Sequence, residues 1–281
     1  MVVLFASLSA LTYGAADFLG GFASRKNSSV TVVAWSQGIG LLIALLAVPL
    51  FGVSSVVRED LLWGIGAGIA GAIGVAFLYH GLANGLASII SPVAALTGAV
   101  LPVFYGIATG EQPPLLSWIG VALAFPAILL LSLEKGGGSA HRLRSFQMGF
   151  LAGVGFSGFF ILIAQTGDSS GMWPLVAART VTVPLFLITL FVRNKPLQLF
   201  EGSRRYALTG GILDMGANIF YLLASRSGLM ITAVVITALY PAPTVLLQRI
   251  FLGERITPVR IGGLVLAIAG AALIGIGGGS R

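Results

Sequence analysis

Three charged residues lie inside long apolar stretches of the sequence: Asp17, Arg179 and Asp214. A charge at the centre of a bilayer costs about 2.5–3.5 kcal/mol on insertion scales, so these side chains should face the interior of a helix bundle. An acid and a base together suit a zwitterion, with Asp17 or Asp214 for the ammonium group and Arg179 or free helix amides for the carboxylate. The alternative is an Asp–Arg pair that braces helices.

A polar stripe runs along one of these apolar stretches, where Asp214, Asn218, Tyr221 and Ser225 recur at helical spacing. Such a stripe predicts the lining of a cavity or a contact with another helix. Further side chains that would complete a small-molecule pocket are Trp35, Tyr79, His80 and Tyr240. The imidazole of His80 has two interpretations, a proton carrier or a hydrogen bond between helices.

Several kinds of chemistry are excluded by what the sequence lacks. There is no cysteine, so the chain has no disulfide, thiolate metal site or cysteine nucleophile. The apolar stretches hold no HExxH motif and no Ser/His nucleophile pair. We therefore expect no metal, no cofactor and no enzymatic activity. The net charge of +7 comes from basic residues that are scattered singly, which argues against a nucleic-acid partner.

The composition assigns the chain to the membrane. It is 57% apolar and 9% charged, with a mean hydropathy of +0.99, whereas a soluble domain has about 25% charged residues. About 20 apolar residues cross a bilayer as a helix, and the runs lack the alternation of a β-barrel. This predicts an all-α polytopic membrane protein with ten spans, over residues 3–23, 30–51, 61–82, 87–109, 115–133, 146–166, 174–192, 206–226, 230–251 and 258–277.

The basic residues predict the orientation of these spans. Twelve Lys and Arg fall on the face that holds the connections after spans 1, 3, 5, 7 and 9, and three fall on the other face. Because cytoplasmic connections carry the excess of Lys and Arg, we expect the first face to be cytoplasmic. Both termini then lie on the outer side of a bacterial-type inner membrane.

The two halves of the chain are similar to each other. At an offset of 143 residues, Gly110-Glu111 falls on Gly253-Glu254 and Phe77 falls on Phe220; at 144, Trp35 falls on Arg179. Five spans per half is an odd number, so the copies must be inverted in the membrane. We expect repeats over residues 1–133 and 146–281, joined by a cytoplasmic connection over 134–145. Inverted repeats favour alternating access, although a duplication could also serve only to build a stable bundle.

These features resemble a known family. A Gly-Glu pair follows the fourth span of each half, and Gly120 or Gly263 lies nine residues past the Glu, as in the drug/metabolite transporter superfamily and its ten-helix EamA-type exporters. Gln112-Pro113-Pro114 departs from that pattern. The closest resemblance is to the bacterial aromatic amino-acid exporters. It implies export of small metabolites from a lipid bilayer by a monomer or an oligomer; the alternative is multidrug or cationic-compound efflux.

Prolines, glycines and two acids add expectations about mechanics. Pro102, Pro241 and Pro243 interrupt the fourth and ninth spans, and each removes a backbone hydrogen bond, so these two spans are the expected hinges. Small residues spaced by four, such as Gly64 and Gly68, predict close helix contacts. Glu111 and Glu254, each directly after a glycine, are expected to cap helix ends or to mark a gate.

Overall fold

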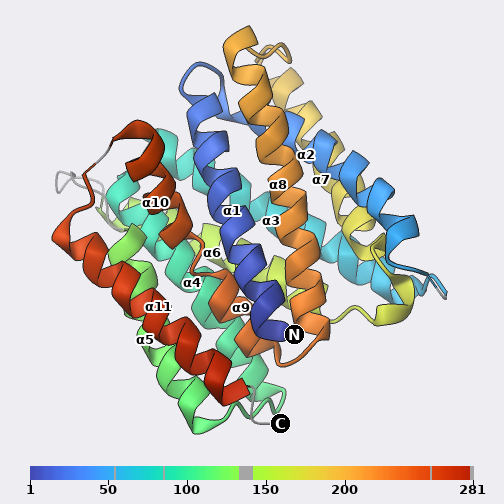
Figure 1. Ribbon diagram of the computed structural model, residues 1–281. Helices are drawn as coiled ribbons and strands as arrows, with labels where there is room; N and C mark the ends of the chain where they lie inside the picture. Colours follow the sequence, from blue (N-terminus) through green and yellow to red (C-terminus); the bar gives the residue numbers. More distant parts are fainter. Residues whose placement is uncertain (54, 85, 133–141, 254, 279–281) are drawn as a thin grey trace.

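The computed structural model describes residues 1–53, 55–84, 86–132, 142–253 and 255–278. Throughout these residues the regular structure is helical, without any strand. Figure 1 shows the helices, whose bounds are α1 Val2–Ser24, α2 Ser29–Ala47, α3 Arg58–Asn84, α4 Ala87–Ala108, α5 Leu115–Ser132, α6 Arg142–Ala164, α7 Trp173–Val192, α8 Glu201–Arg226, α9 Met230–Thr237, α10 Pro241–Leu252 and α11 Pro258–Gly278.

The prediction of ten membrane spans is confirmed. Within the described ranges, ten helical segments are long and apolar enough to cross a membrane. The differences are at the ends: α6 and α8 begin four and five residues earlier than expected, at Arg142 and Glu201. Their first turns are basic or polar, so hydropathy does not count them although the helix continues through them. The expected connection over 134–145 lies mostly outside the described residues.

The ninth span is broken into two helices, whereas the fourth is continuous. Residues 238–240 form a turn between α9 and α10, and α10 begins at Pro241. A proline at the first position of a helix loses no intrahelical hydrogen bond, which makes this a favourable starting point. Helix α4 runs unbroken through Pro92 and Pro102. Of the two expected hinges, only the ninth span therefore has an interrupted helix in this conformation.

The most extensive helix contacts join one half of the chain to the other. Helix α1 packs along α8, and its counterpart α6 packs along α3, the counterpart of α8. In the same way α2 contacts α8 while α7 contacts α3, and the pairs α2–α7 and α5–α11 join equivalent helices across the centre. Figure 1 shows α1 beside α8 and α11 beside α5. This pattern is what a two-fold relation between the halves requires.

Glycines allow the closest of these contacts. A Cβ atom added to Gly64 would lie 2.3 Å from the carbonyl oxygen of Pro174, and one added to Gly120 would lie 2.6 Å from that of Gly270. Both distances are shorter than any real Cβ contact, so only glycine fits there. The predicted glycine contact of the third span is thereby seen in the α3–α7 pair, and α5–α11 is built in the same way.

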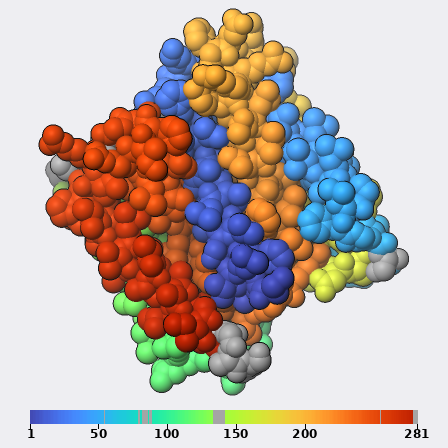
Figure 2. All heavy atoms as spheres, in the orientation of Figure 1, coloured from blue at the N-terminus to red at the C-terminus, as the bar shows by residue number. Residues whose placement is uncertain are grey.

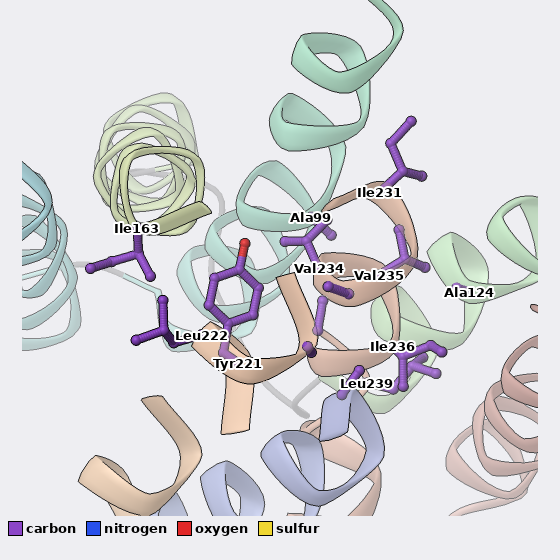
Figure 3. Packing of buried hydrophobic residues seen from close by; sticks show 14 of the residues in the cluster. Ala99, Ala124, Ile163, Tyr221, Leu222, Ile231, Val234, Val235, Ile236 and Leu239 are labelled. Atoms are coloured by element: carbon purple, nitrogen blue, oxygen red, sulfur yellow. The ribbon is translucent and has the colours of Figure 1, made fainter. Parts of the chain in front are cut away.

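The buried apolar core is centred on α9. Figure 3 shows Ile231, Val234 and Val235 of α9 packed among side chains of neighbouring helices, including Tyr221 and Ile163. Large apolar side chains on the outer faces remain exposed, as lipid contact requires. Figure 2 shows α1 lying between α8 and the C-terminal helices, so the first helix is an integral part of the bundle.

Candidate functional site

A cavity of about 530 Å³ lies between the helices of the two halves. Its walls come from α1, α2, α3, α4, α6, α7 and α8 and from the turn before α10. This volume falls within the roughly 300–1,000 Å³ that is typical of small-molecule sites. The polar and aromatic residues that line it are Tyr13, Asp17, Ser24, Ser29, Ser36, Gln37, Phe156, Phe159, Phe160, Arg179, Thr182, Phe186, Asp214, Asn218 and Tyr240.

Arg179 forms a charge-assisted network with α8 and α2. Its Nη2 donates to Oδ2 of Asp214 at 2.6 Å, and its Nη1 donates to Oε1 of Gln37. The Gln37 oxygen also accepts from the hydroxyl of Thr182 at 2.7 Å. Gly40 leaves space for the guanidinium, since an added Cβ would lie 3.2 Å from Nε. Arg179 is buried, so it points into the bundle and not towards lipid.

Asp17 stands in the same cavity without such a partner. It is solvent-exposed on the cavity side of α1, and its carboxylate forms no hydrogen bond or ion pair with any described residue. One turn earlier, the ring of Tyr13 lies 6.2 Å from that of Tyr240 and 6.3 Å from that of Phe160. The two acids of the cavity therefore differ: Asp214 is neutralised by Arg179, and Asp17 is not.

Only part of the polar stripe of α8 lines the cavity: Asp214 and Asn218 do, and Tyr221 does not. Asn218 lines the cavity and donates to the carbonyl oxygen of Asp214 at 2.7 Å. Tyr221 is fully buried outside it, and its hydroxyl donates to the carbonyl oxygen of Phe160 at 2.9 Å. Seven residues of helix span about 10 Å, so Tyr221 lies below the cavity although it shares the face of Asp214. Tyr221 is thus not among the residues that line the cavity, and its predicted contact with substrate stays a prediction.

Trp35 and His80, which the sequence predicted to line the pocket, are also not among the described cavity-lining residues. The indole Nε1 of Trp35 donates to the carbonyl oxygen of Leu197 at 2.8 Å, near the connection between α7 and α8. His80 is half-buried on α3 and is absent from the described cavity lining. The side chain of Tyr79 lies outside the described residues. Trp35 shares a helix with Gln37, but two residues rotate a helical side chain by roughly 200°, which directs it away from Gln37.

The cavity also has walls that the sequence did not single out. Phe156, Phe159 and Phe160 of α6 form an aromatic face, and Thr182 supports Gln37. The phenylalanines lie in an apolar helix, where hydropathy does not separate a cavity wall from a lipid-facing side. Their spacing of three and four residues was the available signal.

The cavity reaches one end of the bundle. Its lining continues along α1 through Gly20 and Gly21 to Ser24, and it includes Ser29 at the start of α2. Gly21 is exposed. The cavity is therefore accessible at the end where the α1–α2 connection lies.

Polar contacts tie the connections together at the opposite end. Asp60 of α3 accepts from the backbone N–H of Gly167 at 3.0 Å and from the hydroxyl of Ser170 at 2.6 Å. Arg226, the last residue of α8, donates to the carbonyl oxygen of Gly171 at 2.9 Å. Between this network and the cavity lies the apolar core around α9. This end is closed.

Comparisons with known proteins agree with this architecture. The model of the EamA-like transporter family matches residues 1–133 and 144–276. No curated protein matches the chain. One solved structure, described only as the crystal structure of a protein, superposes with a TM-score of 0.77 at 15% identity, over 97% of this chain and 95% of that one; at this identity the likeness concerns the fold. The chain belongs to the EamA-like transporter family and is a multi-pass membrane transporter of small molecules.

Proposed function

We propose that this transporter exports amino acids, aromatic or other neutral ones, by alternating access at the central cavity. One observation carries the proposal: an aromatic cavity holds the carboxylate of Asp17, which has no hydrogen-bond or ion-pair partner among the described residues, together with the guanidinium of Arg179. The substrate ammonium binds Asp17. The substrate carboxylate binds Arg179, which uses two N–H groups in its described hydrogen bonds out of the five that a guanidinium offers.

The rest of the cavity suits an apolar or aromatic side chain. Phe156, Phe159 and Phe160 supply one wall, and Tyr13 and Tyr240 supply another. Aromatic rings prefer edge-to-face or offset contacts at centroid separations of about 4.5–7 Å, and the Tyr13 and Phe160 rings already stand in such a contact at 6.3 Å. A substrate ring would extend this cluster.

The direction of export follows from charge and access. The open end of the cavity is the end of the α1–α2 connection, which carries Arg25 and Lys26. By the positive-inside rule that end faces the cytoplasm, so both termini lie on the outer side of a bacterial-type inner membrane. The cavity would then load from the cytoplasm. The repeats 1–133 and 146–281, joined by residues 134–145, would exchange conformations and so open the cavity to one side and then to the other.

A second candidate is efflux of cationic compounds, and a specific observation favours it. Asp17, Asp214 and Arg179 sum to a net charge of −1, and Asp214 already neutralises Arg179. A lipophilic cation would bring the cavity to neutrality, whereas a zwitterion would leave one negative charge. Aromatic walls also attract cations.

Flux into proteoliposomes with matched probes separates the two candidates. Phenylalanine tests the zwitterion, phenethylamine lacks the carboxylate, and 3-phenylpropionate lacks the ammonium group. The amino-acid proposal predicts flux of phenylalanine alone, and its loss in Asp17→Asn but not in the control Glu59→Gln, an exposed acid on another helix. Flux of phenethylamine without phenylalanine would replace the proposal with cation efflux. Absence of flux for phenylalanine and for the other neutral amino acids would reject amino-acid export.

A further inference from the structure

Gln37 has more hydrogen-bonding capacity than its described contacts use. Its Oε1 accepts from Nη1 of Arg179 and from the hydroxyl of Thr182, the latter at 2.7 Å. A guanidinium can only donate, so the Gln37 atom that faces Arg179 must be the amide oxygen and not the nitrogen. The contact with Arg179 therefore fixes the orientation of the amide, and both N–H donors of Nε2 lie on its other side.

The Nε2 atom of Gln37 is open to the cavity. Gln37 is buried within the bundle at 8% exposure, and it is one of the residues that line the cavity. Among the described residues, Nε2 has no hydrogen-bond partner. It is not enclosed either, because throughout the described part of the chain the one enclosed side-chain nitrogen or oxygen without a partner is Oγ1 of Thr237. The donors of Nε2 are therefore available to a molecule in the cavity.

These donors lie next to the guanidinium of Arg179. Because Nη1 of Arg179 donates to Oε1 of Gln37, only the amide group of Gln37 separates Nη1 from Nε2. Gln37 belongs to α2 and Arg179 to α7, two helices that contact each other across the halves of the chain. A carboxylate has two oxygens and about four acceptor positions, so it can accept from both residues at once. The amide adds donors there without adding a second positive charge.

We propose that Gln37 is a specificity-determining residue, whose Nε2 donates to the substrate carboxylate beside Arg179. A site built to hydrogen-bond a substrate group rejects the analogue that lacks it, because the polar groups of the site are then left unpaired. Gln37 thereby favours an amino acid over the amine that lacks its carboxylate. This inference rests on the proposed export of amino acids, and it names a residue that can be altered without removing Asp17 or Arg179.

Gln37→Glu isolates the contribution of the Nε2 donors. The two side chains have nearly the same shape, and glutamate keeps an oxygen for Arg179 and Thr182 while it replaces both N–H donors with an acceptor. In proteoliposomes, the KM for phenylalanine should rise at least about tenfold, the factor that corresponds to one lost hydrogen bond to a charged group. Phenethylamine has an ammonium group and no carboxylate, so it should inhibit phenylalanine flux more strongly than it does in the parent protein.

Two further variants separate substrate binding from structure. Gln37→Met keeps the length of the side chain, has no N–H donor and adds no charge. It should raise the KM for phenylalanine, with inhibition by phenethylamine no stronger than in the parent. Gln165→Glu makes the same substitution as Gln37→Glu at an exposed glutamine directly after α6, outside the described cavity lining, and it should change neither value. Thermal unfolding in detergent micelles shows whether each variant is folded.

The pattern across the variants decides the role of Gln37. If Gln37 serves only to hold Arg179, Gln37→Met raises the KM while Gln37→Glu, which still accepts from Arg179, leaves both values unchanged. That result would overturn the inference and leave the proposed function intact. Equal changes in Gln37→Glu and Gln165→Glu would overturn it as well. Absence of phenylalanine flux in the parent protein would reject amino-acid export and, with it, a carboxylate partner for Gln37.

Discussion

Asp17→Asn and Asp214→Asn each remove one carboxylate from the same cavity, yet the structure predicts different consequences for them. Asp214 accepts a 2.6 Å hydrogen bond from Arg179, whose side chain is 8% exposed. Asp17 forms no hydrogen bond or ion pair with a described residue. Loss of the first carboxylate should therefore lower stability, whereas loss of the second should lower only substrate binding and flux.

The magnitude follows from the geometry of the pair. Removal of one partner from a fully buried ion pair costs about 3–5 kcal/mol. The Asp214 side chain is 26% exposed and Asn keeps a carbonyl oxygen that can still accept from Arg179, so we expect a loss nearer the value of one charge-assisted hydrogen bond, about 1.5–3 kcal/mol. For Asp17→Asn we expect a change within about 0.5 kcal/mol.

Thermal and denaturant unfolding in detergent micelles measures both effects, next to flux in proteoliposomes. A double-mutant cycle of Asp214→Asn with Arg179→Gln isolates the pair. The double variant should lose less stability than the sum of the single variants, by about 0.5–3 kcal/mol, because it leaves no uncompensated charge. Equal stability losses for Asp17→Asn and Asp214→Asn, or strict additivity in the cycle, would refute this account of the two acids.

Two further predictions concern the bundle around the cavity. Gly64→Ala should destabilise the protein by about 1–3 kcal/mol, because its Cβ would lie 2.3 Å from the Pro174 carbonyl oxygen; Gly262→Ala, with open space around it, should be neutral or stabilising by up to about 1 kcal/mol. Thermal unfolding compares them, and an equal loss in both would contradict the packing argument. Tyr221→Phe removes the hydrogen bond to the Phe160 carbonyl oxygen, which keeps its donor within α6, and it should cost about 0.5–1.5 kcal/mol with substrate KM unchanged. A raised KM would indicate that Tyr221 contacts the substrate.

The scaffold could be predicted from the sequence because lipid imposes simple rules. A helix that crosses a bilayer needs about 20 apolar residues. The connections are short, so nearly all apolar residues must lie in such helices. Hydropathy did not reveal the break before Pro241, because the turn at 238–240 is as apolar as the helices on either side. Hydropathy also did not predict that α8 begins at Glu201, because the first turn of this helix is charged and polar and is not apolar enough to be counted.

The structure places some of the candidate residues in the cavity and others outside it, for one physical reason. Periodicity reports the direction of a side chain around a helix, and it placed Asp214 and Asn218 in the cavity as observed. It does not report where a cavity stops along the axis, so Tyr221 was included although it lies about 10 Å further along. Arg179 was found by its charge, but its bond to Gln37 depends on how α2 and α7 meet, which no local pattern contains.

The duplication explains why the family is easy to assign and the substrate is not. Each charged residue of the cavity corresponds to a residue without charge in the other half: Asp17 to Ile161 and Arg179 to Trp35 at an offset of 144, and Asp214 to Gly71 at 143. Among the shared residues, Gly110 and Gly253 follow the ends of helices α4 and α10. Under the proposed function, the residues that bind substrate therefore lie at positions where the halves differ. Changes there can alter what is transported while the two-fold packing, and with it the family signature, stays intact.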